Sequence, residues 1–479
     1  MIIIYAVARN RLIDLTCYYF VDYRIISPTF DARYLVLGPP GSGKSSLLKA
    51  IAGRLYHKGE EDLRGSVTYN GKELYNSKGF YDQPDMHHEN SISLIDQLDR
   101  HAPMYTVEET FNFSFQCKRR NGKHIDFRFQ EDTTENRDLA KRADDNKLLV
   151  DTFIKILDID HVKDSFVGND EIRGVSGGQR RRVTIGEMLM SDSPVICGDE
   201  ISNGLDAGST FDIISTMSYI GKFREKLQVI SLLQPSPEVV SLFDEIVLMA
   251  RGKIIYAGPI LQVESYFASL GYLAPMHMDV GDFLQIISTP DGAELYDPTP
   301  DVAKKRQNPY SLDELADEFR KSRLGKRINS CLKKPNPHIW GSLHGTKSTY
   351  IDQDEPEYVD DRSYKAKYQN NFITCFWLNL KRQITLWRRN KRVLIACAVK
   401  NFIMGISVGS VVHKTENVIS ILGVLFQSMV FVMLGGMVTA PAFVDERLIY
   451  YKQNDANFFG AFPFVFAKAI SKLPQVSTS

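Results

Sequence analysis

The sequence predicts an α/β fold over residues 34–290, followed by a polar linker and an all-α segment suited to a membrane. Short apolar strands alternate with helical segments before residue 290, which is typical of a parallel sheet covered by helices. No long apolar run occurs before residue 390, whereas residues 393–479 contain little else. With 479 residues, the chain is long enough for two or three domains.

The α/β pattern is read from short segments. Asn70-Gly71 is a preferred pair at a two-residue hairpin turn. Thr106 and Glu109 form a capping-box pattern, which marks the start of a helix. The segments in chain order are a strand "YLVLG" (34–38), a helix "SSLLKAIAG" (45–53), a hairpin "GSVTYNGKEL" (65–74), a helix opening at "TVEETFNFSF" (106–115) and a strand "PVICG" (194–198).

Composition excludes some classes of function. The 58 basic and 58 acidic residues give a formal net charge of zero, so there is no electrostatic case for nucleic acid as the main partner. The charged stretch 118–147 begins with basic and aromatic residues, but acids follow at once, and we interpret it as a solvated surface insertion. The six cysteines include no CxxC pair, which argues against a disulfide framework or a zinc site.

A Gly-rich loop follows the first strand. "GPPGSGKS" (38–45) fits the pattern G-x-x-x-x-G-K-[ST], in which glycines let backbone N–H groups close around phosphate oxygens. Lys44 would reach the β- and γ-phosphates of ATP, and Ser45 would bind Mg²⁺. The pattern predicts an α/β P-loop NTPase. The residues expected to bind ATP are Gly38, Pro39, Pro40, Gly41, Ser42, Gly43, Lys44, Ser45 and Ser46.

An acidic pair ends the strand at 194–198. Asp199 would hold Mg²⁺ through its water shell, and Glu200 would act as general base on the attacking water. Alone, such a pair would be interpreted as a surface turn. Its position about 155 residues after the P-loop, with "ISNGLDAG" directly following, favours the catalytic interpretation.

A second phosphate-reading element lies at "RGVSGGQRRRV" (173–183). A Gly-Gly turn there leads into a basic helix, and a helix N-terminus offers free N–H groups and a positive dipole end to an anion. A complete P-loop already occurs earlier in the chain, and the residues alone leave open whose phosphate this second element binds.

Three apolar stretches follow the basic cluster "RRNKR" (388–392), which places that end on the cytoplasmic side. Spans are expected near 393–413, where a buried core helix is the alternative, and at 418–444, where about 27 residues lack a charge and roughly 20 suffice to cross a bilayer. A third begins at 458. The membrane domain is expected to be incomplete.

The region before the spans has two parts. Residues 291–365 are polar and proline-rich, and we expect a linker with one short helix near "SLDELADEFRKS" (311–322). Over 366–392, aromatic and apolar side chains recur every four residues, which predicts an amphipathic helix in the membrane interface, with core packing as the alternative. The recurring residues are Tyr368, Phe372, Phe376, Leu380 and Ile384.

Together, Gly-Lys-Ser, "VSGGQ" and a following Asp-Glu strand end resemble the ATP-binding cassette of ABC transporters. The resemblance implies a head-to-tail dimer in which the signature loop binds the ATP of a second cassette. It also implies roles for Gln97 as the Q-loop glutamine on Mg²⁺ and water, for Asp206 as the D-loop aspartate, and for Gln234 in place of the usual switch histidine. The signature residues are Ser176, Gly177, Gly178 and Gln179.

Chain order narrows the resemblance, because the cassette precedes the spans as in the G subfamily. "GPPGSGKSSLLKAIAGRL", "SLLQPSPE" and "YYKQNDANFF" look most like the full-size pleiotropic drug resistance type. Two departures occur. "DVGDFL" (279–284) replaces the usual Asn-Pro-x-Asp-Phe, and the atypical segment 1–33 lacks the Gly-rich lead-in, so no adenine-stacking aromatic is assigned. The fold expected is thus an ABC cassette followed by an incomplete all-α transmembrane domain.

The expected function is ATP hydrolysis, with Mg²⁺, in an exporter of hydrophobic compounds or lipids. The expected partners are a second cassette, on the same longer polypeptide or on a partner subunit, a lipid bilayer and a hydrophobic substrate, with no nucleic acid. The cassette would face the cytoplasm, and the resemblance implies the plasma membrane. The alternatives are a truncated cassette that regulates a longer partner and a soluble ABC ATPase that acts on ribosomes or DNA; a P-loop kinase would not explain "VSGGQ".

Overall fold

A computed structural model describes most of the chain, which forms two compact units, residues 1–99 with 177–367 and residues 100–176 with 368–479. Nearly all of the predicted N-terminal segment 1–33, and much of the insertion 118–147 and of the linker 291–365, lie outside the described residues. The described residues are 32–54, 67–69, 72–76, 79–80, 92–119, 146–191, 193–223, 226–304, 306–326, 328, 367–413, 418–437 and 440–477.

The first unit is built on a six-stranded sheet in the order β5-β6-β7-β1-β8-β9. The strands from β5 to β8 pair in parallel, and β9 pairs antiparallel with β8. Most strand residues are buried, as expected when helices cover both faces of a parallel sheet. The strands are β1 (Arg33–Leu37), β5 (Ile92–Ile95), β6 (Val195–Gly198), β7 (Leu227–Ser231), β8 (Glu245–Ala250) and β9 (Lys253–Pro259).

This strand order determines where a ligand can bind. In open parallel sheets, ligands bind beyond the carboxyl ends of the strands, where the chain leaves the sheet. The strands β5, β6, β7 and β1 are consecutive neighbours, so the loops that follow them meet at one edge. These are the loops that begin at Asp96, Asp199, Leu232 and Gly38.

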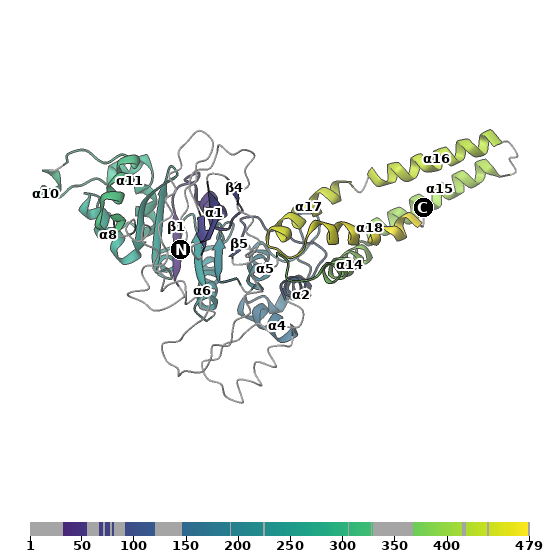
Figure 1. The fold of residues 1–479 in the computed structure, drawn as a ribbon, viewed down its shortest axis with the longest axis horizontal. Helices are drawn as coiled ribbons and strands as arrows, with labels where there is room; N and C mark the ends of the chain where they lie inside the picture. Colours follow the sequence, from purple (N-terminus) through teal and green to yellow (C-terminus); the bar gives the residue numbers. More distant parts are fainter. Residues whose placement is uncertain are drawn as a thin grey trace, which may run out of the picture. The chain divides into compact units, whose positions relative to one another are not determined.

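Helices cover the sheet of the first unit, and α8 and α11 pack next to β9 (Figure 1). A separate three-stranded sheet pairs Tyr69 with Lys72 antiparallel, which confirms the predicted hairpin; the turn residues lie outside the described residues. The elements are α1 (Lys44–Ile51), β2 (Val67–Tyr69), β3 (Lys72–Asn76), β4 (Gly79–Phe80), α5 (Gly177–Leu189), α6 (Ala207–Phe223), α7 (Pro237–Val240), α8 (Ile260–Ser269), α9 (Val280–Ile287), η4 (Pro290–Leu295), α10 (Pro300–Ala303) and α11 (Leu312–Lys321).

The predicted linker contains more ordered structure near its start than one short helix. The 3₁₀ helix η4 and the short helix α10 come first, and α11 follows with a capping box formed by Ser311 and Glu314. One face of α11 is buried against β9, including Leu315 and Phe319. The short helix expected near 311–322 therefore belongs to the first unit.

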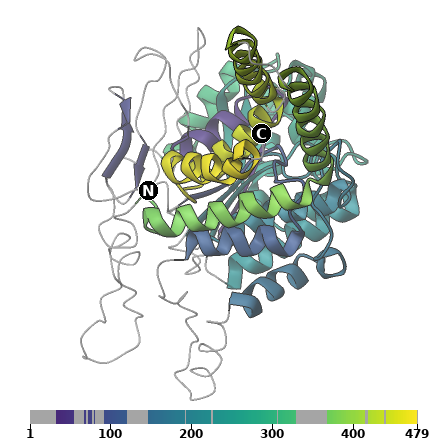
Figure 2. The same cartoon turned by 90° about the vertical axis from the view of Figure 1, so that its right-hand side faces the viewer.

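The second unit is helical. The predicted capping box is confirmed at the start of α2, where the Thr106 hydroxyl accepts from Glu109 N–H and the Glu109 carboxylate accepts from Thr106 N–H. Helix α14 lies between α2 and α18 (Figure 2). The helices are α2 (Val107–Lys118), α4 (Asn146–Ile156), η3 (Asp160–Val162), α14 (Phe372–Arg389), α15 (Lys391–Val412), α16 (Val418–Met437), α17 (Ala440–Asp455) and α18 (Ala461–Ser477).

Helix α14 forms within the predicted amphipathic segment 366–392, but the residues of the predicted stripe are not buried to the same degree. Leu380 is buried, whereas Phe372 and Ile384 are exposed. The buried face is mainly polar, since Arg382 donates to Gln453 Oε1 and to Asn379 Oδ1. The exposed apolar side chains of α14 are Phe372, Ile373, Trp377 and Ile384.

Helices α15, α16 and α18 fall in the segments predicted to span a membrane. Many of the described apolar side chains on α15 and α16 are exposed, among them Phe402, Ile406, Leu425 and Met429. Within the described part of these segments, however, no helix reaches the length and hydropathy needed to cross a bilayer. The three spans stay predictions.

Candidate nucleotide site

The P-loop joins β1 to α1 in a turn that only glycine can make at two points. A Cβ on Gly38 would lie 2.3 Å from the carbonyl oxygen of Met249, and its φ is +151°. Gly43 precedes α1 with a φ of 101°. The Ser42 hydroxyl is buried and has no hydrogen-bond partner in the described structure. An unsatisfied group inside a tight loop at a helix N-terminus fits a loop whose partner is a phosphate.

The side chain of Lys44 is buried inside this loop. Its Nζ donates to Gly38 O at 2.8 Å and Pro39 O at 3.3 Å, and it lies 3.7 Å from Glu200 Oε1. Burial lowers the pKa of Lys44, and the carboxylates of Glu200 and Asp199 oppose this shift. The ammonium group is therefore held where an incoming anion would be its strongest partner.

Oxygen atoms that suit Mg²⁺ gather beside the loop. Ser45 Oγ donates to Asp199 Oδ1 at 2.9 Å, and Ser231 Oγ donates to the same oxygen at 3.0 Å. Mg²⁺ prefers oxygen ligands and usually binds through one or two carboxylates, waters and substrate phosphates. The Asp199 carboxylate and the Ser45 hydroxyl, next to a phosphate loop, fit that requirement. Among the described residues, no group of three or more His, Cys, Asp or Glu side chains that could hold a metal ion is found.

Glu200 lies at the centre of the cluster. Its φ of 44° is unusual for a residue other than glycine, and its N–H donates to Ser231 Oγ at 2.9 Å. Gln97 Nε2 donates to Glu200 Oε2 at 2.8 Å. The structure thus brings together Lys44, Asp199 and Glu200 with Gln97, although these residues come from three different loops.

The predicted signature residues surround the start of α5. Ser176 directly precedes the helix, Gly177 is its first residue, and Gly178 and Gln179 follow. A Cβ added to Gly177 would meet nothing within 4 Å. Ser176 and Gly177 are exposed, so this turn is accessible from solvent.

Asp206 lies just before α6, and its carboxylate accepts from Ser209 N–H at 3.1 Å. Hydrogen bonds from Ser209 lower the pKa of this exposed carboxyl group. Gln234, in contrast, is exposed three residues after β7, and no described hydrogen bond joins it to the cluster around Glu200. The switch role of Gln234 stays a prediction.

Two residues of this edge were not predicted from the sequence. Ser231 ends β7 and bridges Asp199 and Glu200; the signal that could have found it is a polar residue at the end of a buried strand next to β6. Arg181, on α5, is 2% exposed and donates to backbone carbonyls on both sides of the site. Arg181 lies in a run of three arginines, "RRR", and from the sequence such a run is expected to be exposed to solvent.

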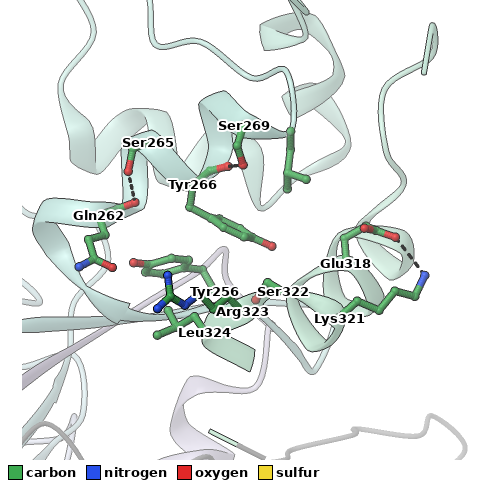
Figure 3. Close-up of a pocket in the computed structure, with 11 residues that line it drawn as sticks. Tyr256, Gln262, Ser265, Tyr266, Ser269, Glu318, Lys321, Ser322, Arg323 and Leu324 are labelled. Atoms are coloured by element: carbon green, nitrogen blue, oxygen red, sulfur yellow. Dashed lines mark hydrogen bonds and ion pairs between the residues drawn. The ribbon is translucent and has the colours of Figure 1, made fainter. Parts of the chain in front are cut away.

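A further hollow of about 440 Å³ opens between α8, β9 and α11 (Figure 3). Tyr256 and Tyr266 line it, with ring centroids 5.2 Å apart. Lys321 and Glu318 lie at its edge and form an ion pair with each other. None of the residues that line it belongs to the P-loop, Q-loop or Asp199–Glu200 cluster.

Comparison with known proteins shows which protein families match the residues of this site. Residues 30–203 match the family model of the ABC transporter domain, and residues 374–478 match that of the ABC-2 type transporter. The chain belongs to the ABC transporters. The P-loop, the Gln97 loop, the first residues of α5 and the Asp199–Glu200 pair all fall within the ABC transporter domain, and α14 to α18 fall largely within the ABC-2 domain.

The relatives are G-family ABC transporters. ABC transporter G family members 44 and 35 of Oryza sativa are 32% and 31% identical over 92% of this chain, and pleiotropic drug resistance protein 1 of Nicotiana tabacum is 30% identical over the same share. The chain spans about 30% of the length of these relatives. A solved ATP-binding cassette of an ABC transporter, in its ADP conformation, matches 48% of this chain and 81% of its own at 24% identity, with a TM-score of 0.34.

Proposed function

We propose that this ABC transporter chain hydrolyses MgATP at the edge formed by β1, β5, β6 and β7, and that hydrolysis drives export of hydrophobic compounds or lipids across a membrane. The observation that carries the proposal is that five side chains lie close together in the structure, namely Lys44, Ser45, Gln97, Asp199 and Glu200. These side chains supply a phosphate-binding cation, two Mg²⁺ ligands, a base and a group that orients it.

Each residue has a distinct task. Lys44 exchanges its contacts with Gly38 O and Pro39 O for phosphate oxygens, while Ser45 and Asp199 would hold Mg²⁺. The bound metal ion would neutralise charge that develops on the phosphate oxygens. Glu200 accepts the proton of the attacking water, and Gln97 holds Glu200 Oε2 in position by donating to it.

A second cassette completes the site in this proposal. The predicted signature residues lie at the start of α5, where a helix N-terminus suits an anion, and the P-loop of the same chain already accounts for one nucleotide. The partner cassette is either part of a longer polypeptide or a separate subunit. We place the cassettes on the cytoplasmic side, and the plasma membrane is the location we propose.

The test is ATP hydrolysis by the full chain in membranes. Lys44→Ala abolishes tight nucleotide binding, and Lys49→Ala, five residues later on α1, is its control. Glu200→Gln keeps nucleotide binding but lowers turnover by at least 100-fold, with exposed Glu264→Gln on α8 as control. Unchanged turnover in the Glu200→Gln protein would contradict the base assignment.

Membrane insertion is tested separately. The exposed apolar side chains of α15 and α16 support a membrane location, and the ABC-2 domain is a membrane domain of transporters. The chain is expected to stay in the pellet after alkaline carbonate extraction. Release into the supernatant would contradict this part of the proposal and favour a soluble ABC ATPase.

A further inference from the structure

Arg181 lies on α5 one helical turn after the signature glycine Gly177, and it is buried although it carries a charge. A buried charge is costly unless its hydrogen-bonding groups are satisfied. All of its partners lie in two loops, the Q-loop after β5 and the loop after β6 that carries the metal ligand and the base. Buried in this way, Arg181 is a contact point for both loops at once.

The shortest hydrogen bond of Arg181 is to the Q-loop. Nη1 donates to Asp96 O at 2.7 Å and to Gln97 O at 3.2 Å, and it lies 3.0 Å from Asp99 Oδ1. The Thr184 hydroxyl also donates to Asp99 Oδ1, at 2.6 Å. Residues three apart lie on the same helix face, so Thr184 and Arg181 hold Asp99 together.

The other edge of the guanidinium contacts the loop after β6. Nε donates to Ile201 O at 3.0 Å, and Nη2 donates to Asp199 O at 3.3 Å and Glu200 O at 3.4 Å. Backbone carbonyls that leave a strand need a donor when they are buried. Arginine presents five N–H donors in a fixed plane, whereas lysine has three on a flexible stem, so only arginine can serve both loops.

We propose that Arg181 is a positioning residue that fixes Gln97 and Glu200 relative to the signature helix α5. This rests on the proposed function, in which the first residues of α5 contact the nucleotide of a second cassette. Because α5 is a continuous helix from Gly177 to Leu189, movement of its first turn is transmitted to Arg181 and then to both loops. Hydrolysis at this chain's own P-loop thus depends on whether its signature helix has engaged the other nucleotide.

The first test compares Arg181→Gln and Arg181→Lys with Arg182→Gln in the full chain. Arg182 is the next residue on the same helix and pairs with Asp212 at 3.8 Å, so this control removes an equal charge. In Arg181→Gln, affinity for ATP stays within about threefold, because the P-loop is untouched. Turnover falls about 10–100-fold, the size expected when a catalytic group is displaced by about 1 Å. The turnover of Arg181→Lys lies between that of Arg181→Gln and that of the unmodified chain, and the turnover of Arg182→Gln matches the unmodified chain.

The second test does not depend on hydrolysis. Backbone hydrogen exchange is measured without nucleotide in peptides that cover residues 96–99 and 199–203. In Arg181→Gln, exchange rises at least fivefold in both loops, including the Asp199 amide, which donates to Ile95 O at 2.9 Å. A purely structural role would raise exchange along α5 and weaken ATP binding to the same extent as turnover.

Each result has a fixed meaning. Exchange that rises only in α5, or turnover that falls in step with ATP affinity, overturns the proposal. If Arg181→Gln does not fold, Arg181→Lys and Thr184→Val test the proposal instead. Both are expected to change turnover and hydrogen exchange in the same direction but by less, and in Thr184→Val the cause is the loss of the hydrogen bond to Asp99. Absence of ATP hydrolysis by the unmodified chain contradicts the proposed function instead, and the exchange comparison still tests Arg181.

Discussion

Ser231→Ala is expected to weaken the use of Mg²⁺ more than the binding of ATP. The Ser231 hydroxyl is fully buried, donates to the Asp199 carboxylate and accepts from Glu200 N–H. The variant removes both hydrogen bonds but leaves Lys44 and the P-loop unchanged. Asp199 keeps one partner, since Ser45 Oγ still donates to it at 2.9 Å.

The magnitude follows from these contacts. A hydrogen bond to a charged group contributes about 1.5–3 kcal/mol, and about 1.4 kcal/mol corresponds to a factor of ten in a binding constant. Loss of a group that orients a metal-binding carboxylate typically costs about 10–100-fold in affinity or activity. We therefore expect the Mg²⁺ concentration for half-maximal ATP hydrolysis to rise at least about tenfold.

The assay is a Mg²⁺ titration of phosphate release at saturating ATP. Ser241→Ala is the matched control, because the exposed Ser241 hydroxyl donates to Glu238 O, within its own turn. Nucleotide affinity measured without Mg²⁺ is expected to stay within about twofold in both variants. A Mg²⁺ requirement in Ser231→Ala within twofold of the unmodified chain would refute the reasoning.

Two further predictions concern stability. Burial alone would raise the pKa of Glu109, but hydrogen bonds from Arg389 and Thr106 outweigh this effect and lower the pKa. The ionised carboxylate therefore stabilises the folded state above about pH 4.5, and this contribution is lost as the pH falls through the folded pKa. Glu109→Gln is expected to lower the free energy of unfolding by about 1 kcal/mol at pH 7, since the Glu109–Arg389 ion pair is partly exposed. In thermal unfolding, the difference in stability between the variant and the unmodified chain should disappear below pH 4.5. A difference that does not change with pH would contradict this. Gly38→Ala is expected to cost more than about 2 kcal/mol, because its Cβ would collide with Met249 O. Gly204 also has a positive φ, but a Cβ there would meet open space, so thermal unfolding of Gly204→Ala should show a loss of only about 1–2 kcal/mol in the free energy of unfolding. Equal losses in Gly38→Ala and Gly204→Ala would count against the collision with Met249 O.

Sequence motifs and the resemblance together named side chains that the structure places close to one another. The P-loop and Asp199 follow short apolar strands that the sequence shows, whereas Gln97 was expected from the resemblance alone. The parallel pairing of β1, β5 and β6 through β7 brings the ends of these strands together. The predicted capping box at Thr106 is confirmed, since a cap is a local feature of four residues.

Features that depend on strand order were not predictable in this way. Ser231 matters only because β7 lies between β6 and β1, and nothing in "VISLLQ" indicates that order. Arg181 is one of three consecutive arginines, and helix geometry alone does not tell which one faces the sheet. Gln234 was assigned by its position in a resemblance, and the structure shows only that its side chain is exposed.

The polar interior of α14 has a practical consequence. Because Arg382 and its partners fix the rotation of the helix, Trp377 is held on the outside, where its ring is 62% exposed. The chain has only three tryptophans, and the other two are Trp340 and Trp387. In a chain with Trp340→Phe and Trp387→Phe, the emission of Trp377 would report directly on its surroundings. A blue shift on adding lipid vesicles, with quenching by brominated lipids, would measure how deep this face of α14 lies in a bilayer, without any attached label.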